Sequence, residues 1–452
     1  MTQCTQIQFS FEAHYSRKVI AEFEDSRLTS DGGSLLLREA NRKTRLIGRL
    51  AQCFQDKRDP ERIEHRLQEM LAQRIYGLAL GYEDLNDHEQ LRQDPLLAML
   101  AGKREISEPL AGKSTLNRME LTPGGSAEDR YHKINYSEAA IDHLLVDLFL
   151  ESYPTAPREI ILDLDATDMP LYGKQEGRFF HGYYGHYCYL PLYIFCDDHL
   201  LCARLRSSNI DASAGSLEEV QRIVAQIRTR WAKTRIILRA DSGFCREELM
   251  SWCEQHQVDY VFGFARNKRL RRKIASPMRE AKQQYRQTGR PARVFTEFRY
   301  RTRQSWSRAR RVVAKAEQIA GKENPRFLVT SLREQEWTPK TLYEQLYCVR
   351  GEMENRIKEQ LSLFADRLST ETLRSNQLRL YLSSMAYVLL HSLRRLGLQG
   401  TEWAKAQVQT IRLRLLKIAA QVQITARRIW ILYSFSYPWK DLYASVWSAL
   451  RC

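Results

Sequence analysis

The chain has 452 residues, 43% of them hydrophobic, which is enough to bury the cores of two or three domains. It carries 70 Lys and Arg against 54 Asp and Glu, a formal net charge of +16. This balance favours a polyanion partner, most simply nucleic acid, over the alternative of an ordinary protein with a basic surface. The ordinary Gly and Pro contents and the absence of long low-complexity tracts argue against wholesale disorder.

The cysteines and the N-terminus predict the cellular compartment. Nine cysteines are scattered along the chain without a Cys-x-x-Cys pair, which argues against a disulfide framework or a zinc ribbon. Reduced thiols are typical of the cytosol. The sequence starts without a basic segment followed by an apolar core, and runs such as "HLLVDLFL" are too short to cross a bilayer. We therefore expect a cytoplasmic protein without a membrane partner.

Residues 1–153 are predicted to be a mostly helical, DNA-binding region. Weak alternation within 1–30 favours strands there, and apolar residues at helical spacing follow, with Gly81 as a C-cap. Further helices are expected at 85–102, 114–119 and 137–151. A helix-turn-helix would fit among them, although plain packing explains short helices equally well.

Residues 154–265 predict a mixed sheet with helices on its faces. Strand patterns occupy 159–165, 187–198, 200–209, 235–241 and 258–265. Helices are expected after a capping box at Ser216 and Glu219 and again within "CREELMSWCEQHQ". A hairpin followed by right-handed parallel crossovers gives such a sheet.

Three further regions are expected beyond residue 265. Residues 266–339 are predicted to be a basic, β-rich insertion, 340–396 to return to the core as helix, and 397–452 to be a basic helical C-terminal region. The insertion opens with "RNKRLRRK", whose basic residues are candidate DNA contacts: Arg266, Lys268, Arg269, Arg271, Arg272 and Lys273. Within the same insertion, Tyr300 and Trp306 are candidates for stacking on an unpaired base, although packing is the commoner role of such residues.

Acidic residues end two of the predicted strands. On the strand of "REIILDLDATDMPLYG", alternation places Asp163 and Asp165 on one face, and Asp168 lies beyond it. Asp241 ends the strand of "LRADSGF". Parallel strands that end in Asp bring both carboxylates to one crevice, where they repel unless a divalent cation neutralises them. Carboxylate oxygens suit Mg²⁺ or Mn²⁺.

A third candidate element is the helix that follows the insertion. Tyr347, Arg350, Glu354 and Lys358 are spaced i, i+3, i+7 and i+11, so they share one helix face. Most such stripes are solvated charged faces. The position of this one, after two strands that end in Asp and a long insertion, favours a functional site.

The order of these motifs resembles that of the DDE transposases of bacterial insertion sequences, in particular insertion-sequence family 1380, which is related to family 4. The stretches that carry the resemblance run nearly from end to end and include "LTSDGGSLLLREA", "LDLDATDMPLYGKQEGRFFHGYYGHYCYLPLYIF", "LRADSGF", "YCVRGEMENRIKE" and "LRLYLSSMAYVLL". The resemblance implies a ribonuclease H-like α/β fold, a mixed sheet flanked by helices, with a helical N-terminal domain and a β-rich insertion before the helix of the catalytic glutamate.

The resemblance also implies roles for individual residues. Asp165, Asp241 and Glu354 match the catalytic, metal-binding triad of the family, while Tyr347 and Arg350 match its phosphate contacts. The family signature ends in a lysine seven residues after the glutamate, but Leu361 stands at that position. Lys358, one helical turn after the glutamate, is the candidate replacement. Asp163 is left as a supporting acid behind the ligands.

The activity implied is that of a metal-dependent polynucleotidyl transferase. Two Mg²⁺ ions per active site, with Mn²⁺ able to substitute, would serve hydrolysis at the transposon ends and joining of the 3′-OH to target DNA, most simply by cut and paste. The implied partners are double-stranded DNA, as terminal inverted repeats and as target, and a second copy of the chain in a synaptic dimer. The expected location is the bacterial cytoplasm, at the nucleoid.

Two other readings of the sequence remain. "DLDAT" also fits the haloacid-dehalogenase type of phosphatase, in which Asp163 would be the covalent nucleophile and Asp165 the acid. That reading leaves the charge, the basic insertion and the Tyr-Arg-Glu stripe unexplained. A transposase-derived DNA-binding protein that has lost catalysis is the non-enzymatic alternative, but all three acidic positions are intact.

Overall fold

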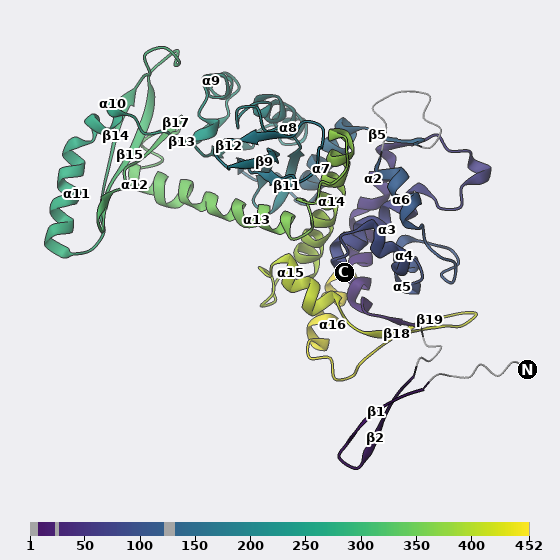
Figure 1. Cartoon of the computed structure of the whole chain (residues 1–452). Helices are drawn as coiled ribbons and strands as arrows, with labels where there is room; N and C mark the ends of the chain where they lie inside the picture. The colour runs from purple at the N-terminus through teal and green to yellow at the C-terminus, as the bar shows by residue number, and fades with distance from the viewer. Residues whose placement is uncertain (1–7, 23–26, 122–131, 452) are drawn as a thin grey trace, which may run out of the picture.

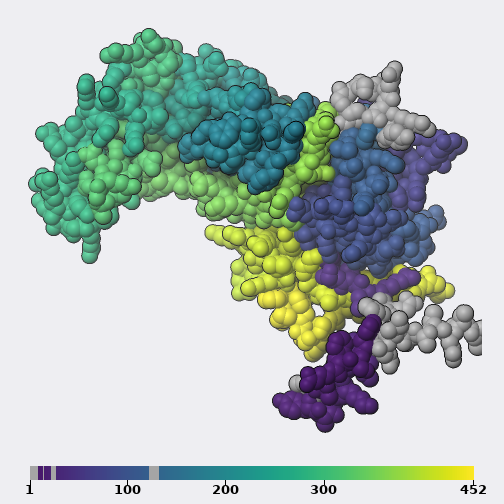
Figure 2. Space-filling model, viewed as in Figure 1, coloured from purple at the N-terminus to yellow at the C-terminus, as the bar shows by residue number. Residues whose placement is uncertain are grey.

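The computed structural model in Figure 1 describes residues 8–22, 27–121 and 132–451. Helices of the N-terminal third lie on one side and a large mixed sheet on the other, with helix α14 (Leu373–Gly397) between them (Figure 1). The space-filling view shows an open concave side between the far end of the sheet and the C-terminal region (Figure 2). Within the described residues, none of the helices combines the length and the apolar character needed to span a membrane.

The N-terminal helices form where apolar residues recur at helical spacing. Gly81 ends α3 with a φ of 96°, a left-handed value that glycine takes without strain, so the predicted C-cap is confirmed. Helix α7 begins where the Ser137 hydroxyl accepts a hydrogen bond of 3.2 Å from the backbone N–H of Ala140. The helices are α1 (Leu35–Thr44), α2 (Leu46–Gln52), α3 (Leu67–Leu80), α4 (His88–Leu91), α5 (Pro95–Ala101), α6 (Lys113–Glu120) and α7 (Glu138–Glu151).

Short strands accompany these helices. The alternation near the N-terminus gives the hairpin of β1 (Gln8–His14) and β2 (Arg17–Glu22), while residues 1–7 and 23–26 lie outside the described part of the chain. The other short strands are β3 (Leu28–Thr29), β4 (Phe54–Asp56) and β5 (Ile134–Tyr136).

The central sheet is mixed, as predicted for a ribonuclease H-like fold. Its strand order is β11–β10–β6–β12–β13–β17–β15–β14, with β16 paired to β15. The strands β6, β12 and β13 are parallel neighbours, and the strands on either side of them run antiparallel. Their bounds are β6 (Glu159–Ala166), β10 (Leu192–Cys196), β11 (His199–Arg204), β12 (Arg235–Ala240), β13 (Asp259–Phe264), β14 (Ala292–Tyr300), β15 (Arg310–Ile319), β16 (Lys322–Glu323) and β17 (Arg326–Thr330).

Both faces of the sheet are covered. Leu162 and Leu164 pack in one cluster with α8 (Ser216–Arg230) and α9 (Glu247–Gln255). Ile161 and Ile237 pack on the opposite face against the π-helical turn η5 (Leu342–Tyr347). The predicted alternation along β6 is therefore confirmed.

The predicted capping box of α8 is wrong. Gly215 is the N-cap of the helix, and the Ser216 hydroxyl donates to the Ser213 carbonyl oxygen at 2.6 Å instead of capping the first turn. Glycine takes this left-handed N-cap position, with a φ of 74°, so the chain begins the helix one residue earlier than the Ser–Glu pattern suggested.

The region 266–339 differs from the β-rich insertion that was predicted. Its first part is helical, as α10 (Lys268–Lys273) and α11 (Ala275–Thr288), and its strands β14, β15 and β17 continue the central sheet. Leu270, Ile274 and Met278 explain the helices, because they recur every four residues and are buried. The many Lys and Arg residues between these three positions obscured their helical spacing in the sequence.

The proposed stacking role of Trp306 and Tyr300 is contradicted by their burial. Each side chain is only 4% exposed, and the Trp306 ring lies 4.9 Å from that of Phe264. Both belong to the apolar cluster that includes α8 and α9. They pack the core at the far end of the sheet and present no face to DNA.

The C-terminal region is also not wholly helical. Strands β18 (Ala420–Ile424) and β19 (Ile429–Tyr433) form a hairpin that pairs with β3. Ala420 and Val422 are buried at alternate positions, which is the strand period rather than the helical one. The helical parts are α15 (Val408–Ile411), the π-helical turn η7 (Arg412–Leu416) and α16 (Lys440–Arg451).

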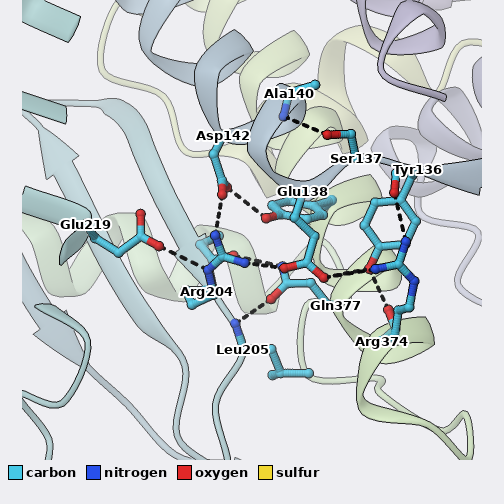
Figure 3. A network of polar contacts seen from close by, with 12 residues as sticks. Tyr136, Ser137, Glu138, Ala140, Asp142, Arg204, Leu205, Glu219, Arg374 and Gln377 are labelled. Carbon is cyan, nitrogen blue, oxygen red and sulfur yellow. Dashed lines mark hydrogen bonds and ion pairs between the residues drawn. The ribbon is translucent and has the colours of Figure 1, made fainter. Parts of the chain in front are cut away.

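A polar network fastens the sheet to the helices beside it (Figure 3). Arg204 on β11 donates to Glu138 and Asp142 of α7 and to Glu219 of α8. On α14, the Gln377 side chain accepts from the backbone N–H of Leu205 at 2.7 Å. Because its members come from four elements, α7, β11, α8 and α14, the network fixes how the sheet sits on the helical region.

Candidate active site

The two strand-ending aspartates lie side by side at the carboxyl edge of the sheet. In the parallel pairing of β6 with β12, Leu164 is opposite Ala240, so Asp165 and Asp241 are the next residues on the two strands. Asp165 accepts from the backbone N–H of Ala166 at 3.0 Å, and Asp241 accepts from that of Gly243 at 2.8 Å. Each carboxylate therefore has one oxygen held by a backbone N–H group.

The helix after the insertion brings the third acid to this edge. The turn η5 runs into η6 (Cys348–Arg350) and α13 (Gly351–Leu361), which crosses below the sheet (Figure 1). Arg350 lies between the acids, 3.6 Å from Asp165 and 3.3 Å from Glu354. Non-α turns within helices are frequent at functional sites. Here Tyr347 ends the π-helical turn and Arg350 ends the 3-10 turn that follows it.

Tyr347 approaches the second aspartate across a glycine. A Cβ atom placed on Gly263 of β13 would lie 2.7 Å from the Tyr347 hydroxyl and 2.8 Å from the backbone nitrogen of Ser242. Any larger residue would push these groups apart, so the glycine permits the close approach. Tyr347 and Asp241 consequently share one wall of the site.

The electrostatics of the site are those of crowded acids. Burial raises the pKa of Asp165 to about 6, with Asp241 and Glu354 adding to the rise and Arg350 opposing it. Burial also raises the pKa of Tyr347, which Arg350 again opposes. A cation bound here would stabilise the ionised form of this buried carboxylate and so oppose the rise in its pKa.

The three carboxylates are suitable ligands for a divalent cation, although they do not converge on one position in this structure. Across residues 8–22, 27–121 and 132–451, no three His, Cys, Asp or Glu side chains converge on one metal position. Asp165 and Asp241 supply adjacent oxygens of the kind that Mg²⁺ prefers. Glu354 stands at the same edge with its side chain 52% exposed, so it is free to turn. Arg350 meanwhile neutralises part of the negative charge.

A basic cleft leads away from the acids. It has a volume of about 720 Å³ and is lined by Asp241, Tyr347 and Arg350 at one end. Its remaining wall carries the positive side chains of Arg266, Lys322 and Arg326. Such a groove, acidic at its head and basic along its wall, has the charge pattern needed for a phosphate backbone that ends at a metal site.

The other predicted DNA contacts lie at different distances from this cleft. Lys358 is exposed one turn after Glu354, whereas Leu361 is partly buried against the helical core. The basic residues of α10 are all exposed, but three already contact the protein itself. Arg271 pairs with Glu323, and Arg269 and Lys273 lie over the rings of Tyr300 and Phe298.

Asp163, which the sequence analysis left as a supporting acid, has a partner that the sequence did not reveal. Its side chain is buried, and Arg239 of β12 donates to both of its oxygens, at 2.6 and 2.7 Å. Arg239 also donates to the carbonyl oxygen of Leu346 in η5 at 2.6 Å. With both oxygens bound, Asp163 is not available as a nucleophile, which removes the basis of the phosphatase reading. The only signal was the arginine itself, inside the apolar run "RIILRAD".

Comparison with known proteins identifies the family of the chain. Among solved structures, the fold is similar to that titled as a cryo-EM structure of the piggyBac transposase synaptic complex with hairpin DNA, at 11% identity and a TM-score of 0.43, covering 86% of this chain and 81% of that one. No curated protein matches the sequence. The profile of the family described as "Transposase DDE domain group 1" matches residues 11–452. The chain therefore belongs to this family of DDE transposases.

Proposed function

We propose that this transposase binds the terminal inverted repeats of an insertion sequence, cleaves the DNA at their ends and joins the freed 3′-OH to target DNA by cut and paste. The observation that carries the proposal is the register that sets Asp165 beside Asp241, with Arg350 linking Asp165 to Glu354 at the head of a basic cleft. The haloacid-dehalogenase reading has no comparable support.

Asp165, Asp241 and Glu354 are the residues that would hold Mg²⁺ or Mn²⁺, two ions per site. When bound, such a pair of ions lowers the pKa of an attacking water or hydroxyl and stabilises charge on the leaving oxygen. The chain itself supplies the rigid part of the site, because the aspartates stand on paired strands and their second oxygens are held by backbone N–H groups. Arg350 is placed to leave its carboxylate partners and contact the scissile phosphate.

The remaining basic residues would position the DNA. Tyr347 and Arg266 line the cleft, and Lys358 extends the same helix face outward. Lys268 and Arg272 of α10 are exposed beyond it and would contact the backbone farther from the cut. The partner is double-stranded DNA, as transposon end and as target. Because two ends must be cut together, the working unit would be a dimer of this chain.

The experiment is strand cleavage with single-site variants. The substrate is a plasmid carrying the DNA that flanks the coding sequence on both sides, incubated with Mg²⁺ or Mn²⁺. The variants are Asp165→Asn, Asp241→Asn and Glu354→Gln, each of which removes one anionic ligand at nearly constant shape. Each is expected to lower cleavage by at least a thousandfold while DNA affinity stays within a few-fold of wild type, since electrostatic stabilisation of the transition state is lost.

Glu352→Gln is the matched control. Glu352 is exposed on the same helix, two residues and so about 200° around from Glu354. This variant should cleave like wild type. Normal cleavage by Asp165→Asn would overturn the assignment of the ligands. Binding without any cleavage by the wild-type protein would instead support the catalytically inactive alternative.

A further inference from the structure

An exposed aromatic hairpin stands next to the acids. It consists of β8 (Phe179–His181) and β9 (His186–Tyr189), which pair so that Phe180 lies opposite Tyr187. Phe180 is 58% exposed and Tyr183, in the turn, 86% exposed. Phe179 and Tyr187 are also exposed. So many large rings in solvent within one short segment mark a binding surface rather than a core.

The base of this aromatic hairpin is firmly held. Strand β9 also pairs with β7 (Met169–Pro170). The buried Tyr189 donates from its hydroxyl to the Glu176 carbonyl oxygen at 2.6 Å, and Ser208 donates to the Phe179 carbonyl oxygen at 2.9 Å. The exposed rings therefore sit on a fixed support, and binding to them would cost little ordering entropy.

Two further contacts place the aromatic hairpin beside the first catalytic aspartate, Asp165. His186 lies 2.7 Å from Asp168, which is only three residues beyond Asp165. The Tyr184 ring packs within 6.1 Å of the His186 ring. Burial raises the pKa of Tyr184 to about 12, and the charges of Asp168 and Asp165 add to that rise. The aromatic surface is thus adjacent to the position where a DNA strand would be cut.

The charge around the rings suits nucleic acid. Lys174 is exposed, and the partly exposed Arg178 guanidinium, which also donates to the Gly173 carbonyl oxygen, lies 4.3 Å from the centre of the Tyr187 ring. Glu176, the one acidic residue between 169 and 189, already accepts from the backbone N–H of Leu373 at 2.9 Å. Aromatic faces interleaved with cations are how proteins hold unpaired strands.

We propose that the aromatic hairpin binds unpaired bases of the DNA strand beside the scissile phosphate, by stacking them on Phe180 and Tyr187. The inference rests on the proposed function for the identity of the strand. In an intact duplex the faces of the bases are stacked on neighbouring bases. The aromatic hairpin would therefore select DNA whose end is opened or frayed. The stacking role that Trp306 cannot fill, because it is buried, is thereby assigned to a different part of the chain.

The test compares two DNA probes by fluorescence anisotropy. One is a blunt duplex, and the other is the same duplex with a single-stranded tail of about ten thymidines, a length within the usual site size of such surfaces. The full-length double variant Phe180→Ala/Tyr187→Ala should bind the tailed probe at least tenfold more weakly than wild type and the blunt probe equally well. The conservative pair Phe180→Tyr/Tyr187→Phe should retain tail binding, since the ring faces remain.

Phe435→Ala is the matched control, because Phe435 is 88% exposed but lies in the C-terminal region. It should bind both probes like wild type. Equal losses on the two probes, no loss at all, or a changed oligomeric state of the free double variant would each overturn the inference. The Asp165→Asn protein should bind the tail normally. If the cleavage experiment failed while the double variant still lost tail binding, stacking would stand without the proposed transposition chemistry.

Discussion

Two aspartates on one strand face have different roles because of their neighbours. Asp163 and Asp165 are separated by a single residue, yet Asp163 is buried in a two-point ion pair with Arg239 and Asp165 lies beside Arg350. Alternation along the strand predicted that both point the same way. It could not distinguish them, since the deciding partner, Arg239, comes 76 residues later.

This difference predicts that Asp163 acts on stability. Asp163→Ala leaves the guanidinium of Arg239 buried without a counter-charge and should lower the free energy of unfolding by about 3–5 kcal/mol. Urea denaturation followed by circular dichroism measures the change. The double variant Asp163→Leu/Arg239→Met removes both charges and should recover most of the loss. A single variant as stable as wild type would show that the pair contributes nothing to the fold.

Among the secondary-structure elements, the periodicity of apolar residues predicted the strands better than it predicted the charged helices. Most central strands lie where apolar runs predicted them, because burial on both faces leaves a strong signal, but the run 187–198 gives two strands, β9 and β10, in different sheets. Helices α10 and α11 lie in a region that was predicted to be β-rich and were missed, since their buried stripe is interrupted by Lys and Arg. The register that joins β6 to β12 and the π-helical turn before α13 depend on long-range packing that no local pattern encodes.

Helix α10 should contribute to DNA affinity through charge alone. Replacing Lys268 and Arg272 by Ala removes two exposed cations and should make the slope of log K against log salt about two units less steep. Binding titrations across a salt series measure it. Arg230→Ala is the control, because Arg230 precedes β12 and so lies at the sheet edge opposite the acids. Equal slopes for wild type and the double variant would remove α10 from the interface.

At the scale of the whole molecule, the site is assembled from three distant parts of the sequence. The aspartates come from neighbouring strands, the glutamate from a helix more than a hundred residues farther on, and Arg204 with α14 ties this assembly to the N-terminal helices (Figure 3). The order of the acidic motifs, with the family resemblance, predicted which residues to examine. The placement of Arg350 between two acids and the exposed aromatic hairpin required the structure.

Under the proposed function, Asp165, Asp241 and Glu354 hold the same divalent ions. Iron(II) bound in place of Mg²⁺, treated with ascorbate and hydrogen peroxide, cleaves a polypeptide next to its ligands, and mass spectrometry locates the cuts. We expect cuts close to residues 165, 241 and 354 that excess Mg²⁺ suppresses and that Asp165→Asn/Asp241→Asn abolishes. Cuts confined to other parts of the chain, or unchanged in that double variant, would show that these three residues do not hold the ions together.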